Sequence, residues 1–255
     1  MNILVILKET FDTEEKITIQ NGQISEDGVE FVINPYDEYA VEEAIKLKEE
    51  FGGEVIVVTV GPSRVESALR TALAMGADNA VIVDDESLSV DEFTISQVLA
   101  AIARKQSFDI ILAGNMSVDN GAGQVGPRLA EELKIPHVTT ITNLSIKDTK
   151  ATVIRDVEGD SEVIEISLPF LATAQQGLNE PRYPSLPGIM KAKKKLIERL
   201  SAEDLGLNPS DLKAKTQIID QYLPPKKEAG RILSGELDGQ IKELVHLLRT
   251  EAKVV

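Results

Sequence analysis

The first half of the chain alternates between short apolar runs and longer amphipathic stretches. The apolar runs are rich in β-branched residues and lie at 3–7, 54–60, 79–85 and 108–114. Strands that are covered on both faces of a parallel sheet have this continuous apolar character. The stretches between them have apolar residues at the three-and-four spacing of a helix, at 37–51, 63–75, 91–105 and 123–133. This order predicts an α/β fold with a doubly wound, mostly parallel sheet.

Two features depart from this alternation. A strand–turn–strand pattern with Asn21-Gly22 at its turn lies at 16–25, inside the first strand-to-helix connection. After Pro136, short β-type runs are separated by turn residues, at 137–147, 150–159, 161–169 and 170–176. We predict that these runs are antiparallel strands, added to the edge of the main sheet or forming a second sheet.

Residues 196–255 differ in composition from the rest of the chain. They are charged and loop-rich until 240–252, where apolar residues again follow helical spacing. We therefore divide the chain into an α/β domain at 1–195 and a C-terminal arm at 196–255. The pattern alone allows the arm to pack on a partner subunit or to fold back onto its own sheet.

Composition narrows the classes of function. The 255 residues include 42 acidic and 27 basic ones, for a net charge of −15, which argues against binding to nucleic acid. The absence of cysteine and the presence of only two histidines exclude thiolate and multi-histidine metal sites, and we expect no metal. No Ser-His-Asp, GxSxG or HExxH pattern occurs, so we expect no catalytic residue. The apolar start at 3–7 is too short for a signal peptide or membrane span, which predicts a soluble intracellular protein without membrane insertion.

The strongest nucleotide-type signal is AGNMSVDNGAGQVG at 113–126. This segment follows a buried strand and opens a helix near Gly123, where backbone amides favour an anion. Gly121, Gly123 and Gly126 would let the backbone approach a phosphate closely. Asp119 and Asn120 could cap the turn or bind a ribose hydroxyl. The alternative is an ordinary glycine-rich turn with a capping Asp, because the segment is neither a P-loop nor a dinucleotide fingerprint.

The other predicted strand ends converge on the same crevice if the sheet is parallel there. Backbone groups near Ile6 and Val60 could then hold a base while the phosphate lies at 123–126. Taken singly, each position is more simply an ordinary strand end or helix cap. The complete candidate set for a nucleotide is Ile6, Lys8, Asn34, Thr59, Val60, Gly61, Ser117, Asp119, Asn120, Gly123, Gln124, Val125 and Gly126.

The stretch GLNEPRYPSLPGIMKAKKK at 177–195 is unlike an ordinary loop. It has three prolines, a leucine and a tyrosine that we expect to be exposed (Leu178 and Tyr183), and four lysines within five residues. Prolines lower the entropy cost of ordering a loop on a partner, and an exposed leucine can fill a partner's pocket. The lysines would speed the encounter with an acidic surface. The alternative is a surface loop with solvated lysines.

Together these segments resemble the β subunit of electron-transferring flavoprotein. Besides the loop, the resemblance is carried by NPYDEYAVEEA (34–44), LRTALAMGAD (69–78), DNGAGQVG (119–126), VIRDVEGD (153–160) and PPKKEAG (224–230), and it covers essentially the whole chain. It implies an adenine-nucleotide hydrolase-like α/β fold that buries an AMP without redox duty. The family's AMP-binding stretches match Ile6, Asn34, Val60, Ser117, Asp119, Asn120 and residues 123–126. It also implies a heterodimer whose α subunit holds most of a redox-active FAD.

The resemblance further implies partners and a docking site. The heterodimer would take electrons from acyl-CoA dehydrogenases in fatty acid β-oxidation and pass them to the membrane quinone reductase, electron-transferring flavoprotein–quinone oxidoreductase. It would work in the cytoplasm of a bacterium or in the mitochondrial matrix. The loop would dock on the dehydrogenase with Leu178 as its anchor. The docking residues implied are Leu178, Asn179, Glu180, Pro181, Arg182, Tyr183, Ile189 and Met190.

Two other functions stay open. One is the β subunit of an electron-bifurcating relative, in which a second FAD replaces AMP in the crevice and accepts a hydride from NADH. The other is a stand-alone nucleotide-binding stress or sensor protein of similar fold. The docking loop and the C-terminal arm argue against the second alternative.

Overall fold

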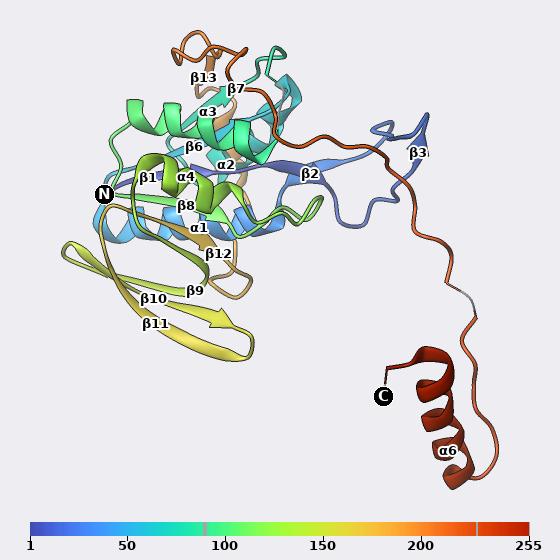
Figure 1. Cartoon of the computed structure of the whole chain (residues 1–255). Coiled ribbons are helices and arrows are strands. Elements are labelled where there is room, and N and C mark those ends of the chain that lie inside the picture. The colour runs from blue at the N-terminus through green and yellow to red at the C-terminus, as the bar shows by residue number, and fades with distance from the viewer. Residues whose placement is uncertain (89–90, 228, 255) are drawn as a thin grey trace. The chain divides into compact units, whose positions relative to one another are not determined.

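A nine-stranded sheet is the centre of the fold in the computed structural model, which describes residues 1–88, 91–227 and 229–254 (Figure 1). The strand order is β11-β10-β9-β12-β8-β1-β6-β7-β13. The four apolar runs of the first half form β1 (Asn2–Ile6), β6 (Glu54–Val60), β7 (Asn79–Val83) and β8 (Ile110–Gly114). These strands pair in parallel with one another. The prediction of a doubly wound, mostly parallel α/β sheet is confirmed.

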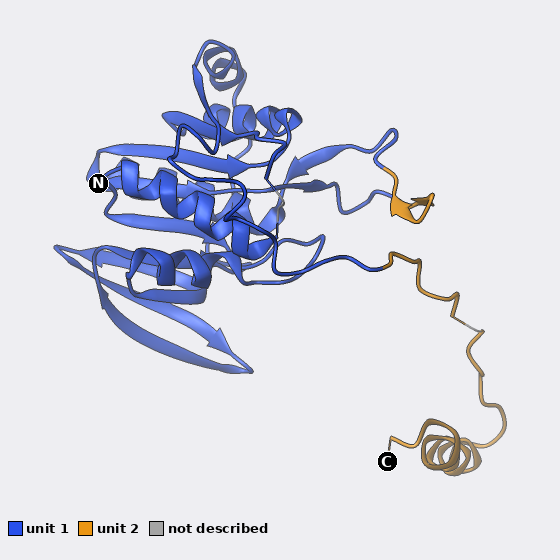
Figure 2. Cartoon of the chain, turned by 45° about the horizontal axis from the view of Figure 1, so that its top comes forward, with its two compact units in different colours: residues 1–17, 26–219 blue, residues 18–25, 220–255 orange. Residues whose placement is uncertain are grey.

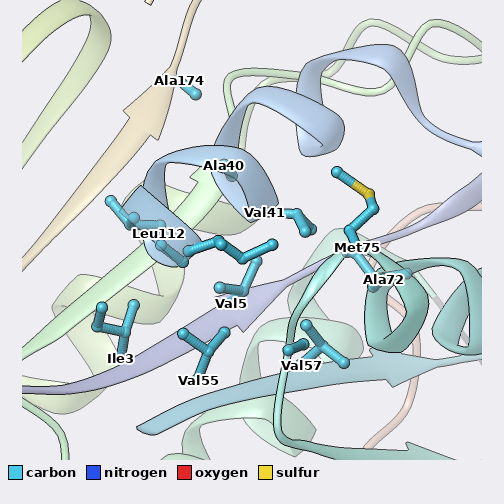
Figure 3. Packing of buried hydrophobic residues seen from close by; sticks show 14 of the residues in the cluster. Ile3, Val5, Ala40, Val41, Val55, Val57, Ala72, Met75, Leu112 and Ala174 are labelled. Atoms are coloured by element: carbon cyan, nitrogen blue, oxygen red, sulfur yellow. The ribbon is translucent and has the colours of Figure 1, made fainter. Parts of the chain in front are cut away.

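Helices cover both faces of this sheet, which explains why its strands are continuously apolar. One core contains residues of α1 (Pro35–Phe51), η1 (Ser63–Val65) and α2 (Glu66–Met75), and the other contains residues of α3 (Glu92–Lys105) and α4 (Val125–Leu133). Ile3 and Val5 of β1 belong to the first core, and Leu4 and Ile6 belong to the second. Figure 3 shows the first core, where Val5 lies beneath α1.

Local signals set the ends of the first long helix. Asn34 precedes α1 and Pro35 occupies its first position, where the missing N–H costs nothing. The helix ends at Gly52, whose φ of 70° is favourable only for glycine. The helix predicted from residue 123 begins at Val125 instead.

The strands after Pro136 divide into two groups. β9 (His137–Lys147), β10 (Lys150–Val157) and β11 (Asp160–Ser167) form the predicted antiparallel ribbon at one edge of the sheet. β12 (Phe170–Ala174) instead lies between β8 and β9 and pairs in parallel with both. The prediction that this run is an antiparallel added strand was wrong. A short apolar run indicates burial, but it does not indicate which strands will flank it.

The main unit extends beyond the predicted boundary at residue 195. The structure contains two elements that the pattern missed, α5 (Leu186–Ala192) and β13 (Ile197–Leu200), and β13 pairs in parallel with β7 at the sheet edge. Ala202, Leu205 and Leu212 are buried in the same core as α3. The two compact units of the chain are therefore residues 1–17 with 26–219, and residues 18–25 with 220–255 (Figure 2).

The remaining elements are small. In the first unit, β2 (Glu9–Phe11) pairs with β5 (Phe31–Ile33) in a separate antiparallel ladder. In the second unit, β3 (Ile19–Gln20) and β4 (Gln23–Ile24) form the predicted hairpin around Asn21-Gly22. The second unit also contains α6 (Leu237–Leu247) and the π-helical turn η2 (Leu248–Ala252), and neither has a buried residue. Among the described helices, none is long and apolar enough to cross a membrane.

Candidate functional site

The carboxyl ends of β1 and β8 mark the point where the connections of the sheet change direction. From β1 the chain proceeds through β6 to β7, and then crosses to β8 on the other side of β1. Ligands of open α/β sheets bind outside the strand ends at such a switch point. The structure brings three segments of the predicted set together here, namely the residues after β1, the start of α1 and the loop after β8.

Asn34 connects these three segments. Its Nδ2 donates to the carbonyl oxygen of Met116 (2.9 Å), and its Oδ1 accepts from the N–H of Val118 (3.0 Å). Its own N–H donates to the carbonyl oxygen of Lys8 (2.8 Å). The side chain is buried. Asn34 therefore positions the loop after β8, and its polar atoms are already bound within the chain.

Asp37 is a site residue that the sequence analysis missed. Its Oδ2 accepts from the N–H of Lys8 (2.7 Å) and its Oδ1 accepts from the N–H of Gly114 (2.8 Å), so one carboxylate joins the ends of β1 and β8. Burial raises the pKa of Asp37 to about 7, against the opposing effect of these two N–H donors, the Asn34 side chain and the Lys8 charge. An aspartate in the first turn of a helix is too common a signal to have marked it from sequence.

Lys8 and Asp119 form an ion pair beside this carboxylate. The distance from Nζ of Lys8 to Oδ2 of Asp119 is 2.6 Å, and both side chains are partly exposed. Although partial burial opposes the change, the hydrogen bond from Lys8 lowers the pKa of Asp119. Because the lysine charge is already paired, it adds little positive potential for an anionic ligand.

The loop after β8 folds into a turn that could receive a phosphate. Gly121 and Gly123 have φ values of 63° and 61°, which favour glycine. The Oδ1 of Asn120 accepts from the Ser117 hydroxyl (2.9 Å) and from the Ala122 N–H (3.1 Å), and these bonds shape the turn. The first N–H groups of α4 have no acceptor inside the helix. Such donors fit an anion of the size of one phosphate.

Two residues at the start of α4 are placed differently from the prediction. Gly126 was predicted to let the backbone approach a phosphate, but a Cβ there would lie 2.6 Å from Cγ2 of Thr173. This glycine is therefore required for close packing of α4 on β12. The Oε1 of Gln124 accepts from Nε and Nη2 of Arg128 (3.1 and 3.0 Å).

The predicted residues at the strand ends contribute mainly backbone. The side chains of Ile6 and Thr59 are buried. The N–H of Gly61 donates to the carbonyl oxygen of Val83 (3.0 Å), which continues the β6–β7 ladder. The parallel register places Ile6 opposite Val58, so the ends of β1 and β6 lie at the same edge.

Two cavities of the described chain lie away from this crevice. One, of about 440 Å³, is lined by residues from the other end of the strands, among them Met1 and Phe108. The other, of about 230 Å³, lies between α1, α2 and residues 181–184. The strand-end site is instead an open surface, because Asp119, Asn120 and Gly121 are exposed. In the described part of the chain, no group of three or more His, Asp or Glu residues is arranged to hold a metal ion.

Of the two apolar side chains expected to be exposed in the loop at 177–195, the structure confirms Tyr183 and contradicts Leu178. Leu178 is only 9 % exposed and belongs to the core beside α1, so the prediction that it is an exposed anchor was wrong. The sequence could not show this, because prolines and charges surround a buried leucine as readily as an exposed one. Large apolar side chains are exposed further along, at Tyr183 (95 %), Leu186 (80 %), Met190 (61 %) and Ile189 (37 %). Leu186, the first residue of α5, was absent from the predicted set.

The other predicted docking residues also divide into two groups. Asn179 and Arg182 bind α1, with the Nδ2 of Asn179 donating to the Tyr39 carbonyl oxygen (3.0 Å). Glu180 is exposed, and Pro181 is half-buried. Of the four lysines, Lys195 donates to the carbonyl oxygen of Ala77. The exposed lysines are Lys191, Lys193 and Lys194.

Comparison with known proteins gives matches over the whole chain. The sequence profile of the electron transfer flavoprotein domain matches residues 21–205. The chain is 59% identical to electron transfer flavoprotein subunit beta of Bacillus subtilis over 100% of both proteins. It is 38% identical to the human electron transfer flavoprotein subunit beta, over 90% of this chain and 91% of that one. It is 41% identical to the caffeyl-CoA reductase-Etf complex subunit CarD of Acetobacterium woodii, over 92% of each. The matched residues include both the strand-end crevice and the loop at 177–195.

Proposed function

The chain belongs to the family of electron transfer flavoprotein β subunits, and from this we propose that it works as one half of a heterodimeric electron carrier. The observation that carries this proposal is the 59% identity over the full length of both chains to a protein of that name. The α subunit would hold most of the FAD, which supplies the electron-transfer chemistry when bound. The residues of this chain bind a structural nucleotide and present a docking surface.

We propose AMP as the ligand of the strand-end crevice. The free N–H groups at the start of α4 suit a single phosphate, and the glycines at positive φ allow it to approach the backbone. Lys8 is paired with Asp119, so the phosphate would be held by backbone dipoles rather than by free cations. The exposed carboxylate of Asp119 offers an acceptor for a ribose hydroxyl, whereas the side-chain oxygen of Asn120 already accepts two bonds within the turn.

The purified heterodimer is expected to release one AMP and one FAD when it is denatured. Separation of the supernatant by chromatography, with absorbance at 260 and 450 nm, measures both (~1:1). Release of two FAD and no AMP would contradict the AMP assignment and favour the bifurcating alternative, for which bleaching of the flavin by NADH is the second test. We retain this alternative because one relative of the chain is a subunit of a caffeyl-CoA reductase complex.

We propose that the loop docks acyl-CoA dehydrogenases through a different leucine from the one first predicted. We define the docking patch as Tyr183, Leu186, Ile189 and Met190, the four exposed apolar residues of the loop and α5. Contiguous exposed apolar side chains with charged residues beside them are typical of interaction sites. Lys191, Lys193 and Lys194 would steer the patch toward an acidic surface. Reduced heterodimer would then deliver its electrons to the membrane quinone reductase.

Replacing Leu186 with Ala is expected to raise the KM for a reduced acyl-CoA dehydrogenase about tenfold, because truncating a docking anchor costs about 1–2 kcal/mol. Flavin content and thermal stability should not change, since this side chain is exposed. The matched substitution Leu178→Ala removes a buried leucine from the same loop. It is expected to lower the free energy of unfolding by about 2–3 kcal/mol. Steady-state kinetics and thermal melts measure the two effects, and an unchanged KM for Leu186→Ala would contradict the docking proposal.

We propose, finally, that residues 220–255, the part of the predicted C-terminal arm that lies outside the main unit, pack on the α subunit. No described residue of α6 is buried, although Leu237, Ile241 and Leu244 form an apolar stripe along it. Surface helices bury such a stripe against another element. A partner subunit would supply that element.

A further inference from the structure

We propose that Arg182 is a positioning residue, which holds the docking patch in its partner-binding shape before any partner arrives. This inference rests on the docking function proposed above. It differs from the initial prediction that Arg182 itself contacts the partner. The guanidinium group is directed at α1, where it makes four N–H···O hydrogen bonds to carboxylates.

Arg182 bridges two carboxylates of α1. Its Nε and Nη2 donate to the two oxygens of Glu42 (2.8 and 2.9 Å), and its Nη1 and Nη2 donate to those of Glu49 (2.6 and 3.1 Å). Its backbone N–H also donates to Glu42 (3.1 Å). The Glu42 side chain is only 6 % exposed, so removing Arg182 alone would leave a buried carboxylate without its ion-pair partner. Two-pronged arginine–carboxylate pairs restrict orientation as well as distance.

The residues just before Arg182 are attached to the same helix. Leu178 is buried against the core, and Asn179 donates to the Glu43 carboxylate (2.9 Å) as well as to the backbone of α1. Pro181 and Pro184 flank the arginine and fix φ on both sides of it. The segment that leads into the docking patch therefore has few alternative conformations.

The far end of the docking patch is held independently. The Ser185 hydroxyl caps α5 by accepting from the N–H of Gly188 (3.1 Å). A Cβ on Gly188 would overlap the carbonyl oxygen of Ala74, so α5 lies directly against the end of α2. Arg70 of α2 donates to the carbonyl oxygens of Ala192 (2.7 Å) and Lys195 (2.6 Å).

This arrangement fixes the backbone of the docking patch at both ends and leaves its side chains in solvent. A partner that binds an ordered surface does not have to supply the free energy of ordering it. Because Glu42 and Glu49 already neutralise Arg182, the arginine is neither a steering charge nor a free donor for the partner. Replacing Arg182 should therefore affect docking by changing how Leu186 is positioned.

The test is a double-substitution cycle in the intact heterodimer, with an acyl-CoA dehydrogenase reduced by its substrate as electron donor. Arg182→Gln is expected to raise the KM about fivefold, with kcat and flavin content unchanged. The docking patch would be more mobile in this variant, so part of the binding free energy would be used to order it. In the Leu186→Ala background, the same substitution should have little further effect, because the anchor is gone. Independent, multiplying effects would overturn the inference.

A second measurement tests positioning without any partner. Hydrogen exchange of the free heterodimer should be faster at residues 183–192 in Arg182→Gln than in the wild type. Unchanged exchange there overturns the inference whatever the kinetics show. By contrast, an unchanged KM in Leu186→Ala overturns the docking function itself, and with it the proposal that Arg182 positions the docking patch for a partner.

Two further variants separate positioning from loss of stability. The pair Glu42→Gln with Arg182→Gln leaves no unpaired buried charge, so it keeps the fold while it still loosens the loop. Arg64 is a matched control, because it also joins a buried carboxylate, Glu9, and an exposed one, Glu26, but lies outside the loop. Arg64→Gln should destabilise the protein without raising the KM or the exchange at 183–192. A raised KM in this control would overturn the specific role of Arg182.

Discussion

Replacing Gly114 with Ala is expected to abolish nucleotide retention and to lower the free energy of unfolding by more than about 4 kcal/mol. A Cβ at this position would overlap Oδ1 of Asp37 and lie 2.7 Å from the backbone carbon of Tyr36. These are atoms at the start of α1, so the overlap can be relieved only by separating α1 from the end of β8. That movement would also break the hydrogen bond from Gly114 to Asp37.

Chemical denaturation at fixed protein concentration, together with the nucleotide content after gel filtration, measures both effects. Gly239→Ala is the matched control, since a Cβ there meets no atom within 4 Å and Gly239 lies inside α6. This control should be neutral or should stabilise the helix by up to about 1 kcal/mol. Wild-type stability and nucleotide content in Gly114→Ala would show that the ends of β8 and α1 are not the rigid wall of the crevice.

Replacing Asp37 with Asn is expected to flatten the pH dependence of stability between about pH 4 and pH 7. Burial raises the pKa of Asp37 from 3.8 to about 7 in the folded chain. The native state therefore binds this proton more tightly than the unfolded state, so the contribution is complete below about pH 4 and is lost as the pH rises through 7. The loss amounts to about 4 kcal/mol. Asn cannot ionise, so its profile should lack this slope. Its amide NH2 cannot accept from the N–H of Lys8 or Gly114, so the variant should also lose a constant amount of stability across the range.

Denaturation midpoints from pH 2 to pH 8 measure this difference. Asp91 provides a comparison of opposite sign, because hydrogen bonds from Thr94, Lys215 and Thr216 lower its pKa to about 2, although burial opposes them. Its contribution is present above about pH 4 and is lost as the pH falls through 2. If Asp37→Asn and the wild type have parallel stability profiles from pH 4 to pH 8, the buried carboxylate does not titrate in this range.

The two leucines of the loop at 177–195 show that local sequence does not determine whether a side chain is buried or exposed. Leu178 and Leu186 both lie among prolines and polar residues. Leu178 is buried because Asn179 and Arg182 bind α1 and draw the preceding residue onto the core. Leu186 is exposed because it opens α5, whose Gly188 and Ala192 are the residues that face α2 and the core. The residues that contact this segment, and so determine the exposure of the two leucines, are about 110 to 145 positions away in sequence. Arg182 and Glu42, for example, are 140 positions apart.

The sequence placed the strand-end crevice more completely than the loop at 177–195. The strand ends and the glycine-rich turn were predictable because parallel strands end at one edge and because glycine tolerates positive φ. Asp37 and the buried role of Asn34 were not predictable from sequence. Asp37 depends on a hydrogen bond from Gly114, the last residue of β8, and Asn34 on hydrogen bonds to the loop after β8, as the 82-residue separation of Asn34 and Met116 shows. Gly126 was predicted to let the backbone approach a phosphate, but the side chain of Thr173 occupies the space beside it.

By itself, the sequence determined the fold class, the order of the buried parallel strands along the chain, the hairpin turn and the family. These follow from short-range regularities, namely apolar period, capping residues and turn residues, together with motifs spread over the whole chain. Only the tertiary structure decided that β12 is an interior parallel strand, that Leu178 is core, that Asp37 joins the ends of β1 and β8, and that Arg182 binds two carboxylates of α1. These outcomes depend on contacts between groups that are far apart in sequence, such as backbone amides and carboxylates. Contacts of this kind leave no local pattern along the chain.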